Sequence, residues 1–270
     1  MIYLFSRNGL KFLESACFAR TLFAFDYDGT LAKIVKNPNE AKINRTTLRL
    51  LQKLSETSSI AVISGRSLSD LKDKFDPPPG FLIGNHGLEG ILANSQKLEV
   101  FENLCKKWKS HLKKTLLDNE VNPGGIEIED KGYSIAVHYR KSRTKRFAKS
   151  LILKSLAMLT PSARIIMGKC VVNIIPVGAP HKGIALLEVM RAAGVDSALY
   201  VGDDDTDEDV FALTDTRILT VRVGKKKNSR AKFYVERQAE IQILLQKIVT
   251  YSKSGLPGAQ KASNETRKTP

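Results

Sequence analysis

The stretch LFAFDYDGT, residues 22–30, decides the fold that this sequence predicts. Four apolar residues run without interruption into Asp26 and Asp28. Two further apolar runs, residues 60–63 and 198–201, end equally abruptly in small polar residues. Apolar runs without polar alternation are typical of strands that are buried on both faces, as in a parallel sheet. The sequence therefore predicts parallel strands with polar groups at their carboxyl ends.

Helical patterns fill the segments between these strands. Leucines at helical spacing follow Asn44, and a second set follows Ser67; both residues are favourable N-caps. The pattern that begins at Ile184 ends at Gly194, which favours a helix stop. Strands that alternate with helices predict a doubly wound parallel sheet. The fold class that we expect for the core is thus α/β.

Residues 100–179 follow a different pattern. They predict a Lys-rich helix, a hairpin that turns at residues 130–132, a second helix and a second hairpin. We expect this segment to form a smaller α/β cap that is inserted into a core domain. The predicted core comprises residues 1–99 and 180–251. Residues 252–270 are polar and contain Gly, Pro and Lys, and they predict a disordered tail.

The composition limits the class of protein. The chain has 270 residues and a net charge of +15, so its surface attracts anions such as nucleic acids, acidic lipids or phosphorylated metabolites. Its three cysteines form no CxxC pair, which argues against a disulfide framework or a zinc site. No apolar run reaches the ~20 residues of a membrane helix, and a signal peptide is not expected. We expect a monomeric cytoplasmic protein without membrane contacts.

The strand ends carry the groups that phosphate-ester hydrolysis needs. In an open α/β sheet, ligands bind outside the carboxyl ends of the strands, so Asp26 and the acidic run at residues 203–209 converge. An ionised Asp26 would attack phosphorus and form an aspartyl-phosphate, which divides a slow reaction into two faster steps. Carboxylate and phosphate repel each other, and Mg²⁺ suits the oxygen ligands that must offset this repulsion. We predict Asp26, Asp203 and the Asp28 carbonyl as ligands, with Asp204 as an outer or second ligand.

Asp28 has a separate predicted role as general acid and base, because it must protonate the leaving oxygen and then activate water. This role requires surroundings that favour the protonated carboxyl group. Gly29 lets the backbone turn close to the phosphate, and Thr30 is expected to fix that turn. Ser64 is expected to donate its hydroxyl to the phosphoryl group. Lys182 is expected to offset the negative charge of the nucleophile and the phosphate.

Each of these groups also has a non-catalytic explanation. An isolated Asp-x-Asp-Gly segment is usually a turn, and Lys182 by itself fits a solvated helix start. Asp207, Glu208 and Asp209 fit a helix N-terminus that interacts favourably with the helix dipole. An EF-hand calcium loop is excluded because its twelve-residue spacing is absent. The order of the groups after predicted strands is what favours catalysis.

The sequence resembles the haloacid dehalogenase superfamily in four motifs, which occur in the expected order at residues 26–31, residues 64–66, Lys182 and residues 202–204. Within this superfamily it is similar to the trehalose-6-phosphate phosphatases over residues 20–250. This similarity rests on the strings GNHG at residues 84–87, EDK at 129–131, VHYR at 137–140, HKG at 181–183 and GDDDTDED at 202–209.

The resemblance implies a haloacid dehalogenase-like core with the cap inserted between the second and third motifs. It also implies a Mg²⁺-dependent phosphatase with an aspartyl-phosphate intermediate and a small-molecule sugar phosphate as substrate. The expected substrate-binding residues are Gly29, Thr30, Arg66, His86, Glu129, Lys131, His138, Arg140 and Asn173. Without the resemblance, Lys131 fits a plain turn, with His138 and Arg140 on the outer face of the cap sheet. His86 also fits a hinge between core and cap.

Asn173 departs from the family pattern. The family usually has a glutamate on this cap strand, where it contacts the sugar; asparagine still bonds a hydroxyl but carries no charge. The predicted substrate is trehalose 6-phosphate, with another glycosyl phosphate, such as glucosylglycerol phosphate, as the alternative. The charge alone also fits an anion- or nucleic-acid-binding protein, but we find no nucleic-acid-binding module and expect no nucleic-acid partner. The intact set of Asp26, Asp28, Lys182 and Asp203 argues against an inactive regulator.

Overall fold

The apolar run of residues 22–25 lies within strand β2 (Thr21–Phe25), inside a sheet of parallel strands. The computed structural model describes residues 1–35, 37–90, 95–118, 124–168 and 170–254. The other strands of this sheet are β1 (Ile2–Tyr3), β3 (Ser59–Ile63), β4 (Phe81–Ile83), β9 (Ser197–Gly202), β10 (Ile218–Val223) and β11 (Phe233–Val235). In this part of the chain the strand order is β1-β11-β10-β9-β2-β3-β4, and all neighbours are parallel. The predicted parallel core is thus confirmed.

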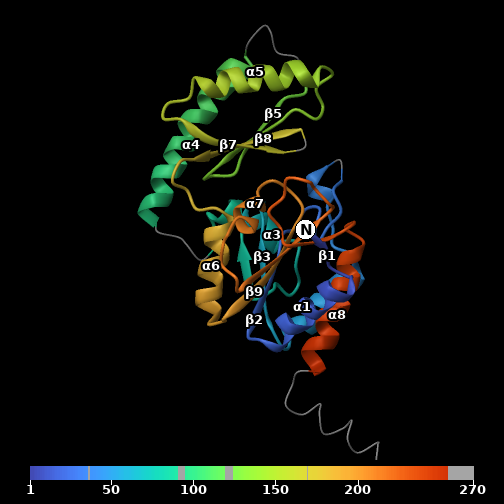
Figure 1. The fold of residues 1–270 in the computed structure, drawn as a ribbon. Helices are drawn as coiled ribbons and strands as arrows, with labels where there is room; N and C mark the ends of the chain where they lie inside the picture. Colours follow the sequence, from blue (N-terminus) through green and yellow to red (C-terminus); the bar gives the residue numbers. More distant parts are fainter. Residues whose placement is uncertain (36, 91–94, 119–123, 169, 255–270) are drawn as a thin grey trace, which may run out of the picture.

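Helices cover both faces of this core sheet (Figure 1). On one face pack α1 (Arg7–Phe18), α2 (Arg45–Ser55) and α8 (Glu240–Ser254). On the other face pack α6 (Lys182–Ala193) and the short α7 (Glu208–Phe211). Short turns complete the core: the 3-10 turns η1 (Pro38–Glu40) and η2 (Asn85–Gly87), and helix α3 (Leu68–Lys72). The sheet is therefore doubly wound, as predicted.

The local signals read from the sequence act as expected. The side chain of Asn44 accepts a hydrogen bond from the Thr46 amide at the start of α2, and Ser67 caps α3 in the same way. Gly194 ends α6 in the left-handed conformation, with φ of 61°. A left-handed residue at this position is favourable for glycine because it has no Cβ.

The segment expected as a cap forms a second, antiparallel sheet. Its strands are β5 (Glu127–Asp130), β6 (Ile135–His138), β7 (Ala163–Gly168) and β8 (Val171–Pro176), in the order β5-β6-β8-β7. Both predicted hairpins are present, and the β6–β8 pairing joins them. Helices α4 (Ser95–Leu116) and α5 (Lys145–Ala157) pack on this sheet, which Figure 1 shows between α5 and the core.

Alternation along the cap strands gives the cap sheet two distinct faces. Val172 and Ile174 of β8 pack against α4 and α5 in a hydrophobic cluster of their own. The residues that alternate with them, Val171 and Asn173, point the other way and line a cavity towards the core. The polar face of the cap sheet therefore looks at the carboxyl ends of the core strands.

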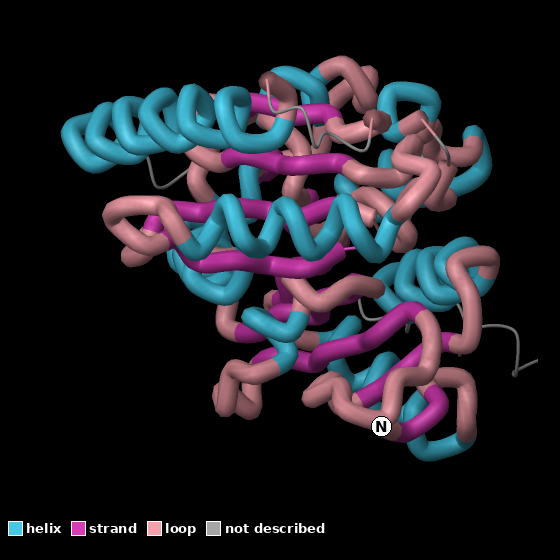
Figure 2. Tube along the Cα trace, turned by 90° about the horizontal axis from the view of Figure 1, so that it is seen from above, coloured by secondary structure: helices cyan, strands magenta, loops and turns pink. Residues whose placement is uncertain are grey.

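Several elements were not predicted from the sequence. They include β1, α1, β10 and β11; β1 is the outermost strand of the core sheet, and Figure 2 marks the N-terminus next to strands at one edge of the molecule. Helix α8 continues to Ser254, which is three residues into the predicted tail, and residues 255–270 lie outside the described residues. None of the helices in the described part of the chain is both long and apolar enough to span a membrane.

Candidate active site

A cavity of about 610 Å³ lies between the carboxyl ends of the core strands and the polar face of the cap sheet. It brings together most of the predicted site residues: Asp26, Asp28, Ser64, Arg66, His86, Glu129, Lys131, His138, Arg140, Asn173, Lys182, Asp203 and Asp204. Gly29 and Thr30 do not line the cavity. Groups that are far apart in sequence thus meet at one end of a parallel sheet, as the strand-end argument predicts.

Asp26 lies directly after β2, and its side chain is almost completely buried. Its backbone amide donates to the Val201 carbonyl at 2.8 Å, which fixes the end of β2 against β9. The Nζ atom of Lys182 donates to Asp26 Oδ1 at 2.9 Å. Burial raises the pKa of Asp26, Lys182 opposes this shift, and the carboxylate of Asp207 adds to it. The ammonium group of Lys182 therefore favours the ionised carboxylate of Asp26, against the effect of burial.

Lys182 is buried between two carboxylates. Besides Asp26, its Nζ donates to Asp207 Oδ1 at 2.7 Å. Asp207 Oδ1 also accepts a hydrogen bond from the Tyr200 hydroxyl at 2.7 Å. The interpretation of Lys182 as a solvated helix start is wrong, because its side chain is only 2% exposed. The buried position suits a charge that acts on Asp26 through low-dielectric surroundings.

Asp207 is the residue that the sequence argument missed. It was interpreted as part of a helix N-terminus, yet it is fully buried and its carboxylate makes no capping bond to α7. The reason is the tight turn after β9, which directs the side chain inwards against the Gly202 backbone. A Cβ at Gly202 would lie 2.2 Å from Asp207 Cγ. The length of the acidic run could have indicated a buried carboxylate, since a helix N-terminus needs fewer carboxylates than this run contains.

Asp203 has the properties of a cation ligand. Its Oδ1 is buried and has no hydrogen-bond partner among the described residues. Burial, together with Asp207 and Asp204, raises the pKa of Asp203 to about 8. Oxygen atoms of Asp26, Asp203 and Asp207 lie within 4.8 Å of one another. A hard divalent cation between such oxygens would offset their repulsion, so the donor set fits Mg²⁺.

The carboxylates of this cluster are not equally available to a cation. The carboxylate of Asp207 already accepts hydrogen bonds from Lys182, Tyr200 and the Asp204 amide. Asp204 Oδ1 accepts from the amide and hydroxyl of Thr206, at 2.8 and 2.6 Å, and thereby fixes the turn. Asp26 and Asp203 are accordingly the side chains best placed to hold a metal ion, with Asp204 beside them.

Gly29 and Thr30 shape the loop from beneath the cavity. Gly29 has φ of +83°, and a Cβ there would lie 2.1 Å from Asp203 Oδ2. The carboxylate of Asp203 therefore approaches the backbone at a point where only glycine fits. Thr30 is fully buried, and its carbonyl accepts a hydrogen bond from Gln238 Nε2 at 3.0 Å. The backbone of Thr30 thus ties the loop to the core, whereas its hydroxyl has no hydrogen-bond partner among the described residues.

We expect Gly29→Ala to lower kcat/KM about 10²-fold, since a misplacement of about 1 Å near the chemistry costs that much. The added methyl group displaces the Asp203 carboxylate, so the affinity for Mg²⁺ should fall together with kcat/KM. A thermal-shift titration with Mg²⁺ measures this affinity. Gly178→Ala is the matched control, because Gly178 has the same φ of +83° but nothing within 4 Å of its Cβ position. Equal losses in both variants would show that backbone strain alone is responsible.

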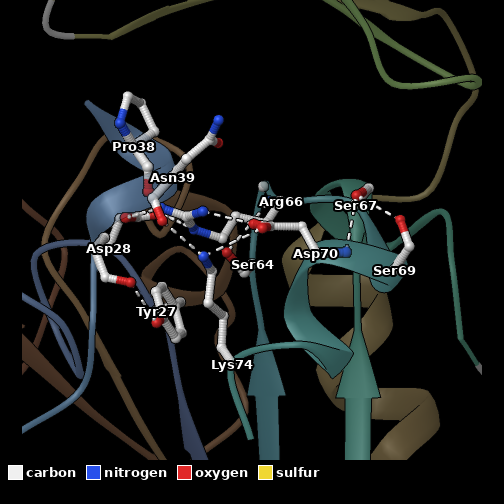
Figure 3. A network of polar contacts seen from close by, with 12 residues as sticks. Tyr27, Asp28, Pro38, Asn39, Ser64, Arg66, Ser67, Ser69, Asp70 and Lys74 are labelled. Atoms are coloured by element: carbon white, nitrogen blue, oxygen red, sulfur yellow. Dashed lines mark hydrogen bonds and ion pairs between the residues drawn. The ribbon is translucent and has the colours of Figure 1, made fainter.

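Asp28 meets a guanidinium instead of the surroundings that were expected to favour its protonated form (Figure 3). Arg66 Nε donates to Asp28 Oδ2 at 2.6 Å, and Nη2 donates to Oδ1 at 2.7 Å. The Asp28 side chain is 40% exposed, whereas that of Arg66 is 8% exposed. Arg66 was predicted to bind substrate, but the structure shows its side chain bound to protein groups at the cavity wall.

Several contacts join the cap to the core. Lys131 Nζ donates to the Gly65 carbonyl at 2.8 Å, and Asn85 Nδ2 donates to the Lys131 carbonyl at 2.8 Å. From β7, Arg164 Nη2 donates to both oxygens of Asp209, at 2.6 and 2.7 Å. Lys131 is therefore more than a plain turn residue, because it connects the cap hairpin to the loop after β3.

The remaining predicted cap residues, Glu129, His138, Arg140 and Asn173, line the cavity. The interpretation of His138 and Arg140 as outer-face residues is therefore wrong. His138 Nε2 and Glu129 Oε2 form a hydrogen bond of 2.7 Å. Burial raises the pKa of Glu129, but the bond to His138 and the charge of Lys131 outweigh it and leave the pKa lowered. Arg140 reaches the core, where its Nη1 donates to the Val35 carbonyl at 3.4 Å.

His86 lies behind the loop after β3. Its backbone has φ of 60°, and its ring packs so closely on Gly65 that a Cβ there would lie 2.4 Å from His86 Cε1. Burial and the charges of Lys131 and Lys182 lower the pKa of His86 to about 3, so the ring is neutral. Within the described residues, neither ring nitrogen has a hydrogen-bond partner.

The fold and the strand-end carboxylates together define a haloacid dehalogenase-type α/β protein. The structure is similar to a crystal structure described as a trehalose-6-phosphate phosphatase related protein, with a TM-score of 0.66, 25% identity, and coverage of 87% of this chain and 99% of that one. It is also similar to the C-terminal domain of C. albicans trehalose-6-phosphate phosphatase, with a TM-score of 0.71, 22% identity, and coverage of 89% and 96%.

A family model described as trehalose-phosphatase matches residues 24–239, and the chain belongs to this family. A trehalose-phosphate phosphatase of Mycobacterium bovis is 31% identical over 69% of this chain and 49% of its own length. An alpha,alpha-trehalose-phosphate synthase of Dictyostelium discoideum is 31% identical over 84% of this chain and 30% of its own length. The chain therefore spans half or less of the length of these two relatives.

Proposed function

We propose that this protein is a Mg²⁺-dependent phosphatase that hydrolyses trehalose 6-phosphate to trehalose and phosphate. The observation that carries the proposal is the arrangement of one cavity. Its core end holds a buried carboxylate, Asp26, bonded to a buried ammonium group. Its cap end holds the polar side chains of Glu129, His138 and Asn173, which are suited to sugar hydroxyls. Membership of the trehalose-phosphatase family supports the same assignment.

In the proposed first step, a carboxylate oxygen of Asp26 forms a bond to phosphorus while the bond from phosphorus to the sugar oxygen breaks. Lys182 offsets negative charge at Asp26. Ser64, which is buried at the cavity wall, is the proposed donor to the phosphoryl group. Bound Mg²⁺, held by Asp26 and Asp203 with Asp204 beside them, would supply further neutralisation of the phosphoryl oxygens.

Asp28 is the proposed general acid and base. It gives a proton to the sugar oxygen as the sugar leaves, and this returns Asp28 to the carboxylate form. It then takes a proton from water, which attacks the aspartyl-phosphate and releases phosphate and free Asp26. Such proton transfers contribute typically 10²–10⁴-fold to a rate. Closure of the cap would exclude bulk water from the intermediate, and the Arg164–Asp209 ion pair supports a closed arrangement.

Asn173 favours a second candidate substrate. It lies on β8 between Val172 and Ile174, on the face that lines the cavity. Its side chain is a neutral amide, which binds a sugar hydroxyl less strongly than a carboxylate at the same position would. Another glycosyl phosphate, such as glucosylglycerol phosphate, is therefore the alternative. Phosphate release from trehalose 6-phosphate, glucosylglycerol phosphate and glucose 6-phosphate at equal concentration distinguishes the two. Faster cleavage of another ester would overturn the substrate assignment, and no cleavage by the folded protein would overturn the phosphatase assignment.

Removal of divalent cations should abolish turnover and also destabilise the fold. We expect Mg²⁺ at 100 times its Kd to add about 2.7 kcal/mol to the free energy of unfolding of EDTA-treated protein. The gain arises because the cation offsets the charge of Asp203, a carboxylate whose pKa is raised by burial and by the neighbouring Asp207 and Asp204. Thermal unfolding with and without Mg²⁺, at matched ionic strength, measures it. Asp203→Asn should lose most of this gain; the same gain in the variant would contradict the assigned metal ligand.

A further inference from the structure

The guanidinium of Arg66, at the cavity wall, contacts protein groups on several sides. Figure 3 shows it between Asp28 on one side and Asp70 on the other, with Pro38 nearby. Its Cζ atom lies 4.9 Å from the centroid of the Tyr27 ring, so the guanidinium stacks on an aromatic face. The Tyr27 ring is itself fixed, because its hydroxyl donates to the Ala41 carbonyl at 3.0 Å.

The donors of Arg66 are almost fully used. Nε and Nη2 bond the two oxygens of Asp28, and Nη2 also donates to the Pro38 carbonyl at 2.7 Å. Nη1 donates to Asp70 Oδ2 at 2.5 Å. A guanidinium has five N–H groups, and four of them are thereby occupied. At most one remains for a phosphate, which removes the two-pronged contact by which arginine normally binds phosphoryl groups.

The contact with Asp28 is of the kind that fixes a carboxylate in space. Two parallel hydrogen bonds define the plane of the carboxylate as well as its position. The guanidinium is held in turn by Asp70, which also forms an ion pair with Lys74 at an Nζ–Oδ1 distance of 3.4 Å. Each carboxylate oxygen of Asp28 keeps a lone pair outside the fork, and the side chain is 40% exposed to the cavity. The fork thus holds Asp28 still while leaving it accessible.

We infer that Arg66 is a positioning residue that orients Asp28 for proton transfer and is not a ligand of the phosphoryl group. The inference rests on the proposed function, because it concerns the acid–base group of that reaction. Substitution of Arg66 should therefore lower kcat, through the displacement of Asp28, and should change the affinity for phosphate little. A direct phosphate ligand would show the opposite pattern.

The test is a double-mutant cycle on Arg66 and Asp28, with steady-state turnover of the sugar phosphate and competitive inhibition by inorganic phosphate as readouts. We expect Arg66→Gln to lower kcat about 10²-fold, as for a misplaced catalytic group, and to change KM and the inhibition constant of phosphate less than about twofold. In the Asp28→Asn background, where no proton is transferred, Arg66→Gln should change kcat less than about twofold. Arg66→Lys keeps the charge but not the fork, so kcat should recover only in part.

Two further variants separate positioning from a scaffold role. Asp70→Asn removes one carboxylate of the network and leaves the fork to Asp28 in place, so its kcat should stay well above that of Arg66→Gln. Arg191→Gln, on an exposed arginine of α6 that bonds Glu188, is the matched control and should behave as the unmodified protein. Circular dichroism and thermal unfolding verify that each variant folds.

Three results would overturn the inference. One is a tenfold or larger rise in the inhibition constant of phosphate in Arg66→Gln or Arg66→Lys. The second is an equal, independent loss of kcat in the Asp28→Asn background. The third is a loss in Asp70→Asn as large as that in Arg66→Gln. Failure of the unmodified protein to cleave any sugar phosphate would instead overturn the proposed function itself, which keeps the two failures distinguishable.

Discussion

Asp26→Asn is expected to lower kcat by at least about 10⁴-fold, because removal of a covalent nucleophile leaves only binding and electrostatic stabilisation. The amide has nearly the same shape as the carboxylate and still accepts a hydrogen bond from Lys182, but it is a poor nucleophile. Folding should be preserved, since the buried carboxylate has a raised pKa and its charge is costly in this position. Phosphate release under saturating substrate, together with thermal unfolding, measures both effects.

Asp196→Asn is the matched control for this experiment. Asp196 is exposed and precedes β9 at the amino end of the strand, opposite to the cavity. The same chemical change there should leave kcat within about twofold, because surface substitutions away from special features have little effect. Retention of more than a tenth of the activity in Asp26→Asn would exclude Asp26 as the nucleophile.

Lys182→Met should reduce both stability and turnover. The substitution keeps most of the side-chain volume but removes the ammonium group from between Asp26 and Asp207. Loss of one partner from a buried ion pair typically costs 3–5 kcal/mol, so we expect a loss of about that size in the free energy of unfolding. Loss of charge stabilisation next to the nucleophile should lower kcat about 10²–10³-fold in addition.

Urea unfolding monitored by circular dichroism measures the stability of Lys182→Met, and phosphate release measures its turnover. Lys11→Met, at an exposed position on α1, controls for the change from lysine to methionine. Stability within about 0.5 kcal/mol of the unmodified protein would contradict the buried network, because that is the range of ordinary surface substitutions.

The carboxyl ends of the core strands could be predicted from the sequence because two local facts determine them. Apolar runs without alternation predict strands of a parallel sheet, and such strands all end at one edge. Asp26, Ser64 and Asp203 therefore had to lie close together whatever the details of the loops. The cap was recognised because its hairpin pattern differs from the strand–helix alternation around it.

The parts that could not be predicted depend on contacts between distant segments. Ile2 and Tyr3 form a strand only because β11 offers its edge, and two residues carry no periodic signal. The inward direction of Asp207 depends on a turn that places it against Lys182, 25 residues away in sequence. The engagement of Arg66 depends on Asp28, Pro38 and Asp70 meeting around it. The residue type alone indicated that Arg66 binds an anion. It did not indicate that the anions are the carboxylates of Asp28 and Asp70 and not a phosphate.

In the proposed reaction, the carboxylate of Asp26 takes the phosphoryl group of a sugar phosphate. The most direct test of this step is an acid quench during turnover of trehalose 6-phosphate with Mg²⁺, followed by mass spectrometry of the peptide that contains Asp26. We expect a phosphorylated peptide, with the modification at Asp26, that is absent from Asp26→Asn and from EDTA-treated protein. Turnover without any phosphorylated Asp26, in a quench fast enough to capture the first turnover, or phosphorylation at another residue, would contradict it.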